Sequence, residues 1–87
     1  MYQAIKTKWI APTNFRGSRV KAIAEAGAVT VSWNDALGVE GNHIAAAKAL
    51  AEKFGWGGDY VGGGLPHSGY AFVVTTHAPH FTVTSAR

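Results

Sequence analysis

Apolar and polar positions alternate along the first part of the chain. In the first such stretch, Ile5, Thr7 and Trp9 share one side, and Lys6 and Lys8 share the other. A period of two residues is typical of a strand with one buried face. The pattern therefore predicts a strand near the beginning of the chain whose two lysines face water.

Two further alternating stretches follow, and turn-forming residues separate all three. The first connection contains Pro12, Asn14, Gly17 and Ser18, and Gly27 marks the second. Short connections between alternating stretches favour antiparallel neighbours. The sequence thus predicts a three-stranded antiparallel meander over residues 2–10, 19–25 and 28–33.

A helix is predicted after the meander. Asn42 is a typical N-cap residue, and the helix is expected from about His43 to Phe54. Gly55 stands where a left-handed residue ends many helices, and Trp56 is placed to pack back onto the last turn. The apolar stripe of this helix is expected to comprise Ile44, Ala47, Leu50, Ala51 and Phe54.

Glycine is concentrated after the predicted helix, where seven of the chain's eleven glycines fall between residues 55 and 69. This composition indicates a flexible connection, with 64–69 as a hairpin loop if residues 60–61 pair with a strand at 70–75. The complete pattern predicts an α+β fold in two layers, with the order β-β-β-α-β and one or two strands after the helix.

Length and composition fit one domain. With 87 residues, 47% of them hydrophobic and 15% charged, the chain can bury one core but has no material for a second. We expect a single α+β domain over residues 1–74 and a C-terminal extension, 75–87, that either forms a short strand at 81–84 or is frayed. Cysteine, a signal-peptide pattern and a long apolar run are lacking, so we expect no membrane association and a location in the cytoplasm of a bacterial host.

Basic residues gather at the beginning of the sequence. Five of the eight lysines and arginines precede Glu25, the first acidic residue, whereas the remainder has three basic and five acidic residues. Such an asymmetry attracts anionic partners, although a solvated strand face beside a turn-forming loop would show the same pattern. We predict that nucleic acid, a nucleoprotein or an acidic host protein surface binds at Lys6, Lys8, Asn14, Phe15, Arg16, Arg19 and Lys21, with Phe15 and Trp9 as stacking surfaces.

The glycine run indicates a second contact region. It lacks the Gly-Lys-Ser/Thr ending of a phosphate loop, and no helix pattern follows it. We predict that a loop in this region contacts a partner through Gly63, Gly64, Leu65, His67 and Tyr70. The four histidines lack a metal-ligand pattern, and no nucleophile motif occurs, so we expect no metal, no cofactor and no enzymatic activity.

Four segments, at residues 2–8, 12–19, 50–56 and 62–66, include the motifs Thr-Asn-Phe-Arg-Gly-Ser-Arg and Gly-Gly-Gly-Leu-Pro. In these segments the chain resembles a family of short uncharacterised proteins carried by phages, plasmids and proteobacterial mobile elements. The similarity covers about residues 2–74 and includes no catalytic motif. It implies an accessory protein of a mobile element, a setting in which nucleic-acid handling and blockade of host defence are common tasks.

Three hypotheses of function follow. The first is a small non-catalytic accessory protein that binds nucleic acid or a nucleoprotein through the basic strand-loop-strand at its beginning. The second is an inhibitor of a host defence system, of the anti-CRISPR type, that acts by protein-protein binding through the arginine-containing and glycine-rich loops. The third is a homo-oligomer with a structural role, joined through an exposed strand edge.

Overall fold

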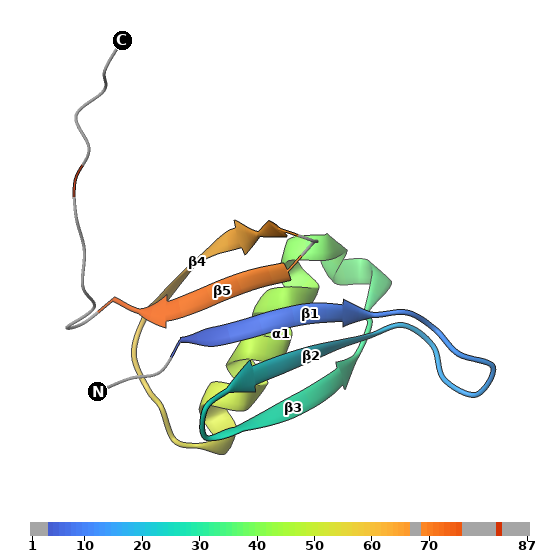
Figure 1. The fold of residues 1–87 in the computed structure, drawn as a ribbon, viewed down its shortest axis with the longest axis horizontal. Coiled ribbons are helices and arrows are strands. Elements are labelled where there is room, and N and C mark those ends of the chain that lie inside the picture. The colour runs from blue at the N-terminus through green and yellow to red at the C-terminus, as the bar shows by residue number, and fades with distance from the viewer. Residues whose placement is uncertain (1–3, 67–68, 76–81, 83–87) are drawn as a thin grey trace, which may run out of the picture.

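The computed structural model describes residues 4–66, 69–75 and 82. One helix packs against one face of a five-stranded antiparallel sheet, so the α+β prediction is confirmed (Figure 1). The strand order is β3-β2-β1-β5-β4. In chain order the elements are β1 (Ile5–Ile10), β2 (Arg19–Ala24), β3 (Gly27–Ser32), the short 3-10 helix η1 (Asp35–Leu37), α1 (Gly38–Lys53), β4 (Tyr60–Leu65) and β5 (Gly69–Val74).

The predicted meander is confirmed, because β2 pairs with both β1 and β3 in antiparallel register. A two-residue turn, Glu25 and Ala26, connects β2 to β3, and Ala24 pairs with Gly27. The second strand therefore ends one residue before the expected boundary at Glu25, and Gly27 begins β3 instead of forming the turn. This tight turn fixes the register of the entire hairpin.

The glycine-rich segment is more regular than the sequence predicted. Residues 60–65 form the edge strand β4, which pairs with β5 along its whole length, from Tyr60 opposite Val74 to Leu65 opposite Gly69. Glycine is used here for space, since a Cβ on Gly62 would overlap the ring of Phe72. The pairing of residues 60–61 with the last strand is confirmed, whereas the flexible connection expected across 60–65 was wrong.

The helix begins earlier than predicted, at Gly38, and Asn42 lies inside it and is buried. The Asn42 side chain donates to the carbonyl oxygens of Gly38 at 2.6 Å and Asn34 at 2.8 Å, and it accepts from the Asn34 amide at 2.7 Å. Asn34 caps η1 by accepting from the amide of Ala36. Asn42 thus ties the helix to the preceding turn from within, so its predicted N-cap role was wrong.

The predicted end of the helix is confirmed. Gly55 has φ 70°, the left-handed conformation that glycine adopts without strain. The amide of Trp56 donates to Ala51 at 2.8 Å and that of Gly55 to Glu52 at 3.2 Å, which is the double hydrogen bond of a Schellman motif. The Trp56 ring then stacks on Phe54, with 5.2 Å between ring centroids.

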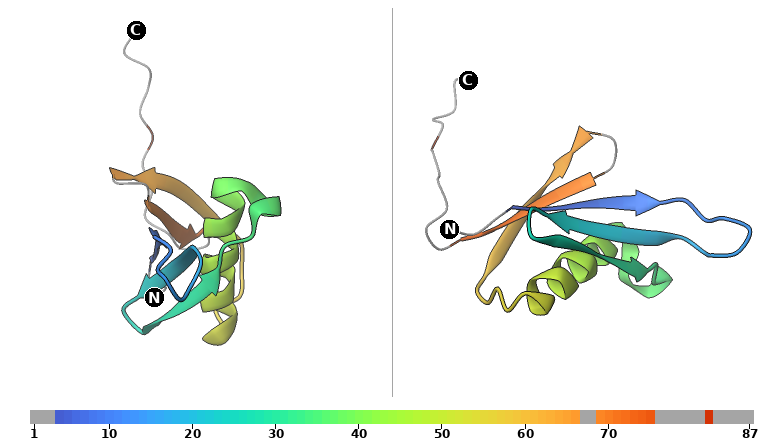
Figure 2. Two further views of the ribbon diagram at one scale, coloured as in Figure 1. Left: turned by 90° about the vertical axis from the view of Figure 1, so that its right-hand side faces the viewer. Right: turned by 60° about the horizontal axis from the view of Figure 1, so that its bottom comes forward.

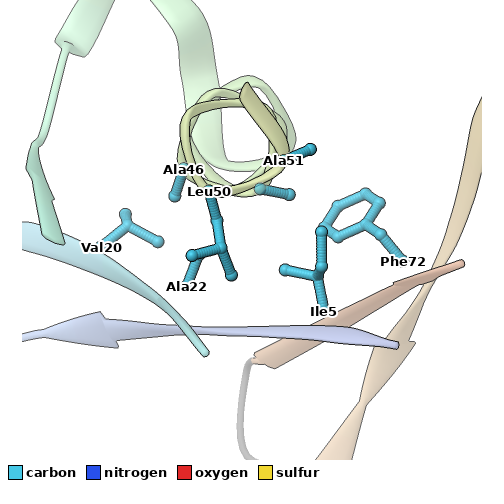
Figure 3. Packing of buried hydrophobic residues seen from close by; sticks show 8 residues of the cluster. Ile5, Val20, Ala22, Ala46, Leu50, Ala51 and Phe72 are labelled. Carbon is cyan, nitrogen blue, oxygen red and sulfur yellow. The ribbon is translucent and has the colours of Figure 1, made fainter. Parts of the chain in front are cut away.

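The core lies between α1 and the sheet (Figure 3). Side chains from the two layers meet there, and Ile5, Val20 and Leu50 are fully buried. The predicted helix stripe was wrong at Ile44, which is 50% exposed, because α1 turns residues 42, 43, 46, 47, 50 and 51 toward the sheet. The pattern failed here because two polar residues, Asn42 and His43, occupy buried positions.

Candidate functional site

The sheet has one covered and one open face. In Figure 2, α1 lies on one side only, and no described element lies against the other side. Alternation along the strands places Ile5 and Thr7 toward the helix and the lysines Lys6 and Lys8 toward the open side. Register brings four of the seven predicted residues onto this open face, namely Lys6, Lys8, Arg19 and Lys21.

The cations of the open face lie close together. Lys8 is directly opposite Lys21 on the neighbouring strand, and opposed residues on one face have Cβ atoms about 5 Å apart. Lys6 lies two residues along the same strand, about 7 Å away. Within the described part of the chain, none of these side chains forms an ion pair. We call Lys6, Lys8, Arg19 and Lys21 the basic face.

None of the five acidic residues is on the strands β1 and β2. Glu25 is in the hairpin turn, Asp35 is in η1, and Asp59 precedes β4. Glu40 and Glu52 are on α1, behind the sheet. The three lysines of the basic face therefore have no carboxylate beside them on these two strands, whereas Asp35 lines a cleft together with Arg19.

Aromatic rings are absent from the open face within the described strands. Trp9 is 49% exposed, but its strand position places it on the helix-facing side, as the alternation predicted, so it does not lie beside the lysines. Toward β4 the open face is aliphatic, with Val61 opposite Val73 and Lys6 opposite Ala71. This surface can contact a charged backbone but offers no platform for stacked bases.

The other three predicted residues, Asn14, Phe15 and Arg16, lie on the loop between β1 and β2, which extends beyond the end of the sheet (Figure 1). All three are exposed, and Phe15 is 95% exposed. The Thr13 hydroxyl accepts from the amides of Phe15 and Arg16, and the Thr13 amide donates to the Arg16 carbonyl at 2.7 Å. These bonds give the loop a defined turn at its tip.

The second predicted contact region is a groove instead of a loop. Gly63, Gly64 and Tyr70 line a groove of about 620 Å³ between α1 and the strands β4 and β5, whereas Leu65 does not line it. His67 lies outside the described residues, as do His77, His80 and, apart from Thr82, the strand expected at 81–84. Gly64 leaves space on the helix-facing side of β4, because a Cβ there would meet nothing within 4 Å, whereas the Phe72 ring fills the space at Gly62.

A smaller cleft was missed by the sequence interpretation. It has a volume of about 480 Å³, and Arg16, Arg19, Ser32, Trp33 and Asp35 are among the residues that line it. The signal was present in the hairpin turn, because a two-residue connection at 25–26 sets Arg19 opposite Ser32. It follows that the residues after β3 must lie beside the β1–β2 loop, as the hydrogen bond from the Trp33 amide to the Ser18 carbonyl shows.

A buried polar pair joins the helix to the central strand. Thr7 and His43 are each 1% exposed, and the Thr7 Oγ1 and the His43 Nδ1 share a hydrogen bond of 2.7 Å. The His43 ring also lies against Tyr70, with centroids 4.7 Å apart. Burial lowers the pKa of His43 below its ordinary value, because the charged form loses hydration. This pair faces away from the basic face.

Comparisons with known proteins give no match to a family model, to a curated protein or to a solved structure. The likeness to mobile-element proteins therefore stays a prediction. Among the described residues, no group of three or more histidine, cysteine, aspartate or glutamate side chains is placed to hold a metal ion. The described part of the chain also has no helix with the length and apolar character needed to cross a membrane.

Proposed function

We propose that this protein is a non-catalytic accessory protein that binds nucleic acid through the basic face, with the β1–β2 loop extending the contact. The observation that carries this proposal is the placement of Lys8 directly opposite Lys21, beside Lys6 and Arg19, with no ion pair to any of the four among the described residues. Like charges on directly opposed strand positions destabilise a sheet. A bound polyanion relieves that repulsion.

The composition of this surface favours nucleic acid over an acidic protein. Lysine is depleted in the buried centres of protein interfaces, whereas lysine and arginine supply the charges that neutralise phosphates. Three of the four basic-face residues are lysines, and no aromatic anchor accompanies them on the described strands. The partner class that fits is a phosphate backbone.

Binding of this kind should depend little on base sequence. Contacts from ammonium groups to phosphates position a nucleic acid but do not identify its bases. The exposed Phe15 at the loop tip is the one aromatic side chain of the predicted site that can stack on a base. We therefore expect similar affinities for single-stranded oligonucleotides of different composition.

The test is oligonucleotide binding by fluorescence anisotropy over a series of salt concentrations. The variant Lys8→Gln with Lys21→Gln should bind weakly, and the slope of log K against log salt should decrease in magnitude by about 2, one for each phosphate that is no longer neutralised. The control is Lys48→Gln with Lys53→Gln, which removes the same charge from α1. The control should bind like the unchanged protein.

Equal decreases of affinity in both double variants would refute the basic face as the site and would indicate only a net-charge effect. A partner that is recovered from nuclease-treated lysate and released by the Lys8 and Lys21 changes would instead favour an acidic host protein. We also propose, from the sequence resemblance, that a phage or another mobile element carries this accessory protein.

A further inference from the structure

The cleft beside the β1–β2 loop combines opposite charges in one small space. It lies at the end of the sheet where β2 begins and β3 ends, and its volume is about 480 Å³. Small-molecule sites in proteins have volumes from about 300 to 1,000 Å³. Its lining includes Arg16, Ser18, Arg19, Ser32, Trp33 and Asp35.

The two arginines supply positive charge from different elements. Arg19 is the first residue of β2, and its position opposite Ser32 is fixed by the strand ladder. Arg16 follows the turn that the Thr13 hydroxyl stabilises. A guanidinium group has five N–H donors in a planar fork and is well suited to phosphate oxygens.

One of these donors has no hydrogen-bond acceptor. The Arg19 Nε is buried, and within the described part of the chain no group accepts a hydrogen bond from it. Buried donors are nearly always satisfied in folded proteins, so this N–H is available to an acceptor that enters the cleft. Asp35 does not serve as that acceptor, although it lines the same cleft.

Asp35 adds an acceptor to the cleft. Its position is held by the cap that Asn34 provides for η1 and by the two hydrogen bonds between Asn34 and the Asn42 side chain. Within the described residues Asp35 forms no ion pair with either arginine. A carboxylate only accepts hydrogen bonds, so the cleft presents N–H donors and an oxygen acceptor together.

We infer that this cleft binds a single nucleotide unit, with its phosphate at Arg16 and Arg19 and an O–H or N–H donor of its sugar or base at Asp35. The indole of Trp33 is the aromatic group of the lining. A nucleotide carries the anion for the arginines and, on its sugar and base, O–H and N–H donors for Asp35 within one small unit. This inference rests on the proposed function, because it places one unit of the bound strand.

Isothermal titration calorimetry with guanosine 5′-monophosphate, guanosine and inorganic phosphate tests the cleft without a polymer. The nucleotide should bind more tightly than the nucleoside or the phosphate. Arg19→Lys, which keeps the charge but removes the planar fork, should weaken nucleotide binding about 10- to 100-fold. Arg16→Gln should also weaken nucleotide binding. Because Arg16 is on the exposed loop, this variant tests the role of the arginines even if the Arg19 variant folds poorly.

Asp35→Asn separates a binding role from a structural one. Removal of the carboxylate charge should leave inorganic phosphate bound at least as tightly as before, while the preference for the nucleotide over phosphate decreases. An Asp35 that only supports η1 would lower both affinities together. If the Asp35→Asn variant retains the full nucleotide preference, the assigned role of this carboxylate is overturned.

The variant Lys8→Gln with Lys21→Gln distinguishes this inference from the proposed function. It should bind the oligonucleotide only weakly and should retain guanosine 5′-monophosphate binding, since neither lysine lines the cleft. If the unchanged protein binds the oligonucleotide but not the nucleotide, the cleft is not a nucleotide site, and the assignment of oligonucleotide binding to the basic face is unaffected. If the unchanged protein binds the nucleotide but not the oligonucleotide, the basic face is not an oligonucleotide site, and the assignment of the cleft as a nucleotide site is supported.

Discussion

The two faces of the sheet are made by the same strands and have opposite properties. On β1, Ile5 and Thr7 are buried under α1, whereas Lys6 and Lys8 alternate with them and are exposed. On β2, alternation buries one side in the same way, and Lys21 lies opposite Lys8 on the open side. Stability is therefore concentrated on one face and charge on the other. Substitutions on the two faces should separate folding from binding.

The largest expected effect is on the covered face. Leu50→Ala should lower the free energy of unfolding by about 2–5 kcal/mol, because it leaves a cavity among fully buried side chains. Ile44→Ala, on the same helix but half exposed, is the matched control and should change stability by less than about 1 kcal/mol. Urea unfolding measures both. Equal decreases in stability would contradict the assignment of the buried helix face.

The next effect concerns the glycines of β4. Gly62→Ala should destabilise the protein by about 1–3 kcal/mol, because the new Cβ would overlap the Phe72 ring and force it to move. Gly63→Ala is the control, since a Cβ there meets nothing within 4 Å. Thermal unfolding of the two variants compares them. A Gly62 variant as stable as the Gly63 variant would show that the packing of β4 on Phe72 is not tight.

A pH effect is expected from the pair in the covered face. The lowered pKa of His43 means that the unfolded chain binds a proton more readily than the folded one. This contribution to stability is present above the unfolded-state pKa of 6.5 and is lost as the pH falls below it toward the folded-state pKa. Urea unfolding at about pH 7.5, 6.5 and 5.5, which bracket the ordinary histidine pKa, measures the decrease.

The double variant Thr7→Val with His43→Leu removes both partners of the buried hydrogen bond. It should lack the part of the pH dependence that His43 causes. An unchanged slope of stability against pH in this variant would assign the dependence to other groups.

The smallest effect on stability belongs to the open face and has the opposite sign. Lys8→Glu replaces a like-charged cross-strand pair with an opposite-charged one, so it should stabilise the protein by about 0.2–1 kcal/mol. The same change should abolish oligonucleotide binding. A variant that is destabilised and no longer binds would show that the two faces are not independent.

Period-two alternation predicted the meander and the shared face of the lysines, because strands impose that period on any chain that buries one side. Helix boundaries were less predictable. Asn42 and His43 have polar side chains whose partners, Asn34 and Thr7, are specified only by the tertiary structure. The regular strand β4 could not be predicted from the sequence for a similar reason. Gly62 has low strand propensity, and its use as space for the Phe72 ring depends on the pairing of two strands.

The candidate site was predictable in part. The lysines of β1 and β2 follow from alternation, but Asp35 enters the cleft only through the hairpin register and the cap at Asn34. Composition therefore predicts an anionic partner, whereas the cleft that we propose for a single nucleotide unit follows only from the structure.

The proposed assignment of binding to the open face can be tested in one experiment. Protein labelled with ¹⁵N is titrated with a single-stranded oligonucleotide, and the amide chemical shifts are followed. We expect the largest changes at Lys6, Lys8, Arg19 and Lys21 and along the β1–β2 loop, with little change along α1. Changes centred on α1 and the groove beside β4, with an unaffected basic face, would contradict the assignment of binding to the open face.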